Sequence, residues 1–66
     1  MVSKIEKFRV NHDKSQEEVA IIMGCSPYKY NLKEKGLINF TVEEIRIFKA
    51  YFNLSIEETW DIFFEE

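Results

Sequence analysis

The chain has 66 residues, 45% of them hydrophobic, and a formal net charge of −3. A chain of this length forms one domain, residues 1–66, whose single core is only marginally sufficient, so we expect no catalytic cleft, small-molecule substrate or cofactor and no enzyme activity. Its longest apolar run, 20–23, is far shorter than the roughly 20 residues of a membrane span, and no hydrophobic signal region opens the chain. These features predict a cytoplasmic protein without a membrane partner.

Helix-capping residues and helical hydrophobic spacing predict an all-α protein of five helices. The first helix, 3–11, would turn Ile5 and Phe8 inward. The second, 16–23, begins after Ser15, because Ser15 and Glu18 have the spacing of a capping box. It presents Val19, Ala20 and Met23 on one face, and Gly24 supplies the left-handed residue that ends it.

A third helix follows almost at once. Ser26 is a capping residue and Pro27 suits the first helical position, where its missing amide costs nothing. This helix runs to about residue 35 and stops at Gly36. Two helices of about eight residues joined by a short turn form a helix-turn-helix unit at about 16–35, whose second helix can lie in the major groove of DNA.

Two further capping boxes, Thr41 with Glu44 and Ser55 with Glu58, predict helices at 42–52 and 56–64. Helical spacing assigns to the inward face of the fourth helix the residues Val42, Ile45, Phe48 and Phe52, and to that of the fifth Ile56, Trp60 and Phe63. Surplus apolar residues beside these stripes are either closed over internally or form a homodimer interface; they are Ile47, Tyr51, Ile62 and Phe64.

The order of these elements, with the segments SQEEVA, GCS and NLSIEE and the pair Glu34 and Gly36, resembles the phage lambda-repressor and Cro-like helix-turn-helix family over about residues 5–60. Residues 30–58 look most like small regulators of phages and mobile elements of Gram-positive bacteria. The resemblance implies a compact five-helix lambda-repressor-like domain, a recognition helix at 27–35 and a phosphate contact from Gln16. Dimers on a two-fold operator are common in that family.

The face of the third helix that the resemblance turns outward carries Pro27, Tyr28, Asn31 and Leu32. This is a weak set for base recognition, which usually relies on paired hydrogen bonds from Arg, Lys, Asn or Gln. Lys33 falls on the inward side. Either its stem runs along the core edge with the ammonium in water, which we favour, or the helix is rotated so that Leu32 is partly buried.

Two functions remain open. The first, which we favour, is a DNA-binding transcriptional regulator of a phage or mobile-element switch. In it Gln16, Asn39 and the lysines, Lys29 and Lys35 among them, position the protein on duplex DNA, and Tyr28, Asn31 and Leu32 enter the groove. The alternative is an antirepressor that binds and inhibits a partner repressor protein. Its apolar docking patch would consist of Pro27, Tyr28, Leu32, Leu37 and Ile38, and we expect at most one of Leu37 and Ile38 to fold under.

The charge distribution agrees with the first function only for part of the chain. Residues 1–40 hold seven basic and five acidic residues, whereas 41–66 hold two basic and seven acidic residues. The N-terminal two thirds would therefore face DNA, and the acidic third would face away or meet a protein.

Other chemistry finds little support. The single histidine, His12, and the single cysteine, Cys25, supply no metal set of usual spacing, so we expect no metal. Cys25 is expected to be a small buried apolar residue. The paired glutamates all fall in first turns of helices, where carboxylates cap amides, rather than forming acid–base pairs.

Overall fold

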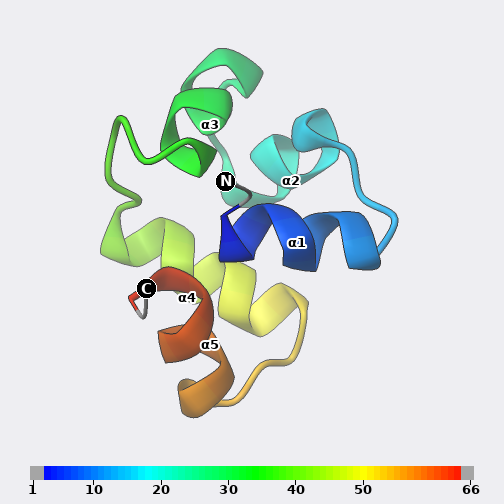
Figure 1. Ribbon diagram of the computed structural model, residues 1–66, viewed down its shortest axis with the longest axis vertical. Helices are drawn as coiled ribbons and strands as arrows, with labels where there is room; N and C mark the ends of the chain where they lie inside the picture. The colour runs from blue at the N-terminus through cyan, green and yellow to red at the C-terminus, as the bar shows by residue number, and fades with distance from the viewer. Residues whose placement is uncertain (1–2, 65–66) are drawn as a thin grey trace.

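The computed structural model describes residues 3–64, which form five helices and no strand. The helices are α1 (Lys4–Asn11), α2 (Gln16–Met23), α3 (Pro27–Glu34), α4 (Val42–Tyr51) and α5 (Ile56–Phe63). The predicted all-α, five-helix fold is confirmed, with each helix end within a residue of its expected position. In Figure 1, α1 crosses the middle of the molecule, with α2 and α3 towards one end and α4 and α5 towards the other.

The helix starts have the caps that the sequence predicts. Ser15, Thr41 and Ser55 each accept a hydrogen bond from the backbone amide three residues on, and the glutamate at that position accepts one from the cap's own amide. These capping boxes satisfy amides that an isolated helix end leaves unpaired. The end of α2 is also set by local sequence. The helix stops at Gly24, whose φ of 80° is a left-handed conformation that glycine adopts without strain.

A small core lies where the helices meet. Its buried residues are Ile5, Val19, Ala20, Met23, Tyr30 and Phe48. Phe48 of α4 is its aromatic centre, with ring centroids 5.4 Å from Phe8, 4.7 Å from Phe52 and 5.2 Å from Phe63. Such tilted and edge-on ring pairs add to the free energy gained by burying the rings. The core thus joins α1, α4 and α5 on one side to α2 and α3 on the other.

The predicted inward stripe of α5 is wrong in two of its three members. Ile56 is 77% exposed and Trp60 58% exposed, whereas Thr59 is buried and Ile62 and Phe63 pack against the core. Thr59 can be buried because its hydroxyl donates to the Ser55 carbonyl at 2.8 Å and so has a partner within the helix. Residues 56, 60 and 63 and residues 59, 62 and 63 both follow helical spacing, and the packing of α5 against α1 and α4 selects the second set.

Helical spacing also predicts Val42 on the inward face of α4, but this residue is 68% exposed. In the first turn of α4 the inward position belongs to Glu44, which is buried because it both caps the helix and holds an ion pair with Lys33. Ile45, Phe48 and Phe52 occupy the inward or partly buried positions that their spacing predicts.

Candidate functional site

The candidate site is the outer surface of α3 together with the loop that follows it. Ser26 begins α3 by accepting from the Lys29 amide at 3.2 Å, and Pro27 takes the first helical position. Gly36, with φ of 83°, turns the chain out of the helix, and the Leu37 amide closes the turn on the Leu32 carbonyl at 2.9 Å. This left-handed end sends the next residues away from the core.

The last turn of α3 is fixed to α1 and α2 by one buried carboxylate. Glu34 is 4% exposed and accepts two hydrogen bonds from Arg9, at 2.8 and 3.2 Å. It also accepts from Gln16 at 2.8 Å and from the Tyr30 hydroxyl at 2.7 Å. Arg9 uses a further N–H to hold the Lys14 carbonyl at 2.8 Å. We refer to Arg9, Gln16, Tyr30 and Glu34 as the Glu34 cluster.

Protonation within the Glu34 cluster follows from these contacts. Burial opposes ionisation of Glu34, but the hydrogen bonds from Arg9, Gln16 and Tyr30 together outweigh it and lower its pKa. The Glu34 hydrogen bond correspondingly raises the pKa of Arg9. Burial, reinforced by the nearby carboxylate, raises the pKa of the Tyr30 hydroxyl. The cluster therefore contains an ionised pair and a neutral phenol, and its two members on α3, Tyr30 and Glu34, are buried and not available to a ligand.

Lys33 corrects the expectation that its ammonium lies in water. The side chain is 8% exposed, and its ammonium forms a buried ion pair with Glu44 of α4. Burial opposes ionisation of Glu44, yet the contacts from Lys33 and from the Thr41 amide lower its pKa overall. Lys33 thus links α3 to α4 through a buried ion pair, and it is not available to a ligand. Leu32 is partly buried, as the alternative orientation of the helix expects.

Seven of the ten predicted site residues are exposed and lie on the N-terminal part of α3 or in and beside the following loop: Pro27, Tyr28, Lys29, Lys35, Leu37, Ile38 and Asn39. Tyr28 is 74% exposed and Leu37 71%. Neither Leu37 nor Ile38 folds under, since Ile38 is also 41% exposed, and this agrees with the expectation that at most one of them does. The glycine turn explains this, because it carries the segment past the core edge.

The other three predicted residues, Gln16, Asn31 and Leu32, are partly buried. Gln16 accepts a hydrogen bond from Asn31 at 3.2 Å while donating to Glu34, so the start of α2 is bonded to the outer edge of α3. Each amide group has a second N–H. The pair can therefore keep its mutual bond and still donate outward.

Sequence reasoning missed the residues that orient α3, namely Arg9, Tyr30, Lys33, Glu34 and Glu44 in these roles. One local signal was present: Tyr30 and Glu34 are four residues apart and so share a face of α3. The other contacts join residues that lie far apart in sequence, 25 residues for Arg9 with Glu34 and 11 for Lys33 with Glu44, and only the packing of the helices brings them together. Ile21, 73% exposed on the outer side of α2, was also not singled out.

The four residues offered as a dimer interface do not share one exposed patch. Ile62 packs against the core and Ile47 is half-buried, whereas Tyr51 and Phe64 are 55% and 54% exposed. Tyr51 lies under the ammonium of Lys14, 5.9 Å from its ring centroid. Cys25, expected to be buried, is half-buried against the core, and burial raises the pKa of its thiol.

Within residues 3–64 no cluster of His, Cys, Asp and Glu side chains is suited to hold a metal ion. None of the helices described is long and apolar enough to cross a membrane. Comparison of the chain with protein-family models, with curated proteins and with solved structures finds no match.

Proposed function

We propose that this protein is a small helix-turn-helix regulator that binds duplex DNA through α3, as its resemblance to the lambda-repressor and Cro-like family implies. The observation that carries the proposal is the one-sided attachment of α3. Tyr30, Lys33 and Glu34 hold it from the inside, while the side chains from Pro27 to Lys29 stand free. A helix presented in this way is the element that enters a major groove in proteins of this architecture.

The exposed side chains divide by chemistry. Lys29 and Lys35 lie near opposite ends of α3 and suit phosphate contacts on the two walls of a groove. Tyr28 and Asn31 can hydrogen bond to base edges, and Pro27 and Leu32 can contact thymine methyl groups. The bond between Gln16 and Asn31 would link a phosphate contact on α2 to a base contact on α3.

The outward residues of α3 are a weak set for base recognition, which supports a second candidate function, an antirepressor that docks on a partner repressor. Tyr28 and Leu37 are both more than 70% exposed, and Ile38 lies beside Leu37 in the chain. Exposed aromatic and aliphatic side chains with few charges are typical of the centre of a protein interface. DNA remains the first proposal because the residues flanking this patch, Lys29 and Lys35, are basic.

The two candidates are distinguished by measuring DNA affinity at several salt concentrations. Duplexes that the protein enriches from a random pool are labelled with a fluorophore, and the protein is titrated into them. DNA binding through α3 predicts an affinity that falls linearly with salt on a logarithmic plot, and Lys35→Ala reduces the slope by about one. Arg46→Ala, which removes an exposed charge from α4, is the matched control and leaves the slope unchanged.

Failure to enrich any duplex at about 50 mM salt would reject DNA as the partner. Tyr28→Ala and Leu37→Asp then test the antirepressor function. The antirepressor function requires both variants to lose binding to a candidate repressor protein in a direct titration, with Arg46→Ala again unaffected.

A further inference from the structure

The outer face of α5 carries an apolar strip that no part of the described chain covers. Ile56, Trp60 and Phe64, here called the Trp60 stripe, are 77%, 58% and 54% exposed. They are spaced four residues apart and so lie above one another on successive turns. The rings of Trp60 and Phe64 lie 4.9 Å apart between centroids, which makes the strip continuous at that end.

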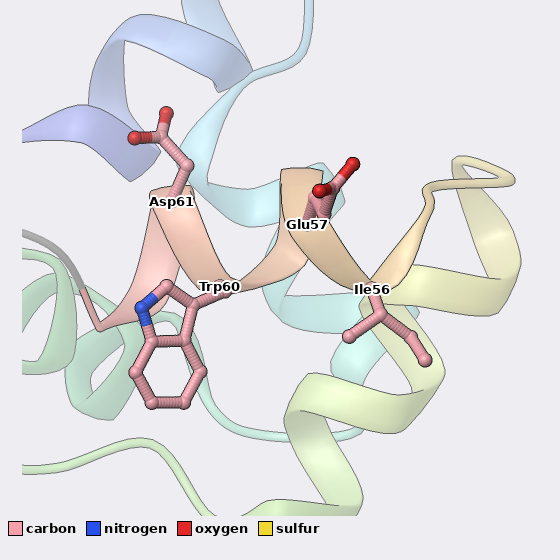
Figure 2. Close-up of a pocket in the computed structure, with 4 residues that line it drawn as sticks. All are labelled: Ile56, Glu57, Trp60 and Asp61. Carbon is pink, nitrogen blue, oxygen red and sulfur yellow. The ribbon is translucent and has the colours of Figure 1, made fainter.

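An acidic edge runs beside the Trp60 stripe. In Figure 2, Ile56 and Trp60 project from one side of α5, and Glu57 and Asp61 project from the other. These four residues line a hollow of about 370 Å³. Asp61 also holds Lys4 of α1 at 2.9 Å, whereas the Glu57 carboxylate is exposed on the first turn. The helix itself is acidic, since α5 carries Glu57, Glu58 and Asp61 and no basic residue.

We propose that the Trp60 stripe is the docking surface for a cationic segment of another protein, such as an amphipathic helix with an apolar seam flanked by Lys and Arg. The apolar seam would cover Ile56, Trp60 and Phe64, and its basic residues would meet Glu57. A guanidinium can also lie over the indole face, where cations are attracted to the ring. Trp is one of the residue types enriched among the side chains that dominate binding at protein interfaces.

Charge and size both argue against a second copy of this chain as the occupant. A two-fold contact sets the same patch against itself, so Glu57 and Asp61 of one copy would meet those of the other. The three side chains offer roughly 400 Å² at their observed exposure, from about 150–250 Å² for each large side chain. A stable dimer needs about 800 Å² on each partner, whereas a smaller interface is typical of a weak, transient contact with another protein.

This surface is separate from the one proposed to bind DNA. In Figure 1, α3 and α5 lie at opposite ends of the long axis of the molecule. Occupation of one therefore leaves the other accessible, and the two proposals fail independently.

The fluorescence of Trp60 can report on binding to the stripe, because Trp60 is the only tryptophan in the chain. The probe is a synthetic helix of leucine and lysine, about 18 residues or five turns long, with leucine along one face. Its addition to the full chain should shift the Trp60 emission to shorter wavelength in a saturable way. Ile56→Asp and Glu57→Lys should each weaken the affinity about tenfold. Glu17→Lys, an equal change of charge at an exposed residue in the first turn of α2, is the matched control and should change the affinity by less than about twofold.

Several results would overturn the proposal. One is equal binding of a peptide with glutamate in place of lysine, and another is equal weakening by Glu57→Lys and Glu17→Lys. A blue shift of Trp60 with protein concentration alone, removed by Ile56→Asp, would show that the occupant is a second copy. A shift with zwitterionic lipid vesicles but not with the peptide would assign the stripe to a membrane surface. Absence of any shift with the peptide would equally end it.

Discussion

The Glu34 cluster makes a quantitative prediction about stability. In Glu34→Gln the carboxylate that accepts four hydrogen bonds is replaced by an amide with a single acceptor oxygen, and the Arg9 charge, 11% exposed in its side chain, loses its counter-ion. Removing one partner of a buried ion pair costs about 3–5 kcal/mol, because the other charge remains buried. We expect a loss at the lower end of this range, since glutamine keeps the shape of the side chain.

That loss is large for a domain of this size. At about 0.05–0.15 kcal/mol per residue, the free energy of unfolding of the chain should be roughly 3–10 kcal/mol. A loss of about 3 kcal/mol lowers the melting temperature by about 12–24 °C. Urea and thermal unfolding followed by circular dichroism will measure both quantities, and Arg9→Met with the double variant completes a cycle for the pair.

The pH dependence gives a second test of the same contacts. Folding lowers the pKa of Glu34 below its ordinary value of 4.5, so its ionised form stabilises the folded chain above that pH. This contribution is lost as the pH falls through the lowered pKa. The difference in unfolding free energy between the wild type and Glu34→Gln should therefore be largest near neutral pH and shrink below pH 4.5.

A variant within about 0.5 kcal/mol of the wild type at neutral pH would contradict the assigned role of Glu34. Strict additivity in the Arg9 and Glu34 cycle would contradict the direct ion pair. A stability difference that does not change in acid would show that the carboxylate is not ionised in the folded protein.

Two further predictions concern the other fixed points of the fold. Lys33→Met should destabilise the protein by about 3–5 kcal/mol in urea unfolding, because the Glu44 carboxylate stays buried without its cation. The double variant Lys33→Met with Glu44→Gln should recover most of this loss. Equal stability of the single variant and the wild type would exclude the buried ion pair. Gly24→Ala should cost about 1–2 kcal/mol through backbone strain alone, since φ is 80° and a β-carbon there would meet no atom within 4 Å. Gly24→Asn should cost less, because Asn tolerates this conformation better, and equal losses in thermal melts would show that strain is not the cause.

Helix boundaries followed from the sequence because the interactions that set them are local. A capping box joins residues three apart, and the left-handed residue at a helix end needs only its own backbone freedom. Ser15 with Glu18, Thr41 with Glu44 and Gly24 could therefore be recognised without any knowledge of the fold.

The buried face of each helix and the partners of the buried charges do not follow from local sequence, because they depend on where the helices cross. Spacing alone allowed α5 to bury either Trp60 or Thr59, and the packing of α5 against α1 and α4 selects Thr59. Likewise, Lys33 belongs in the interior only because Glu44 of α4 lies opposite it. Local chain chemistry therefore determines the five helices of this protein, whereas the three-dimensional packing of those helices determines which charges are buried in pairs and that Trp60 remains on the surface.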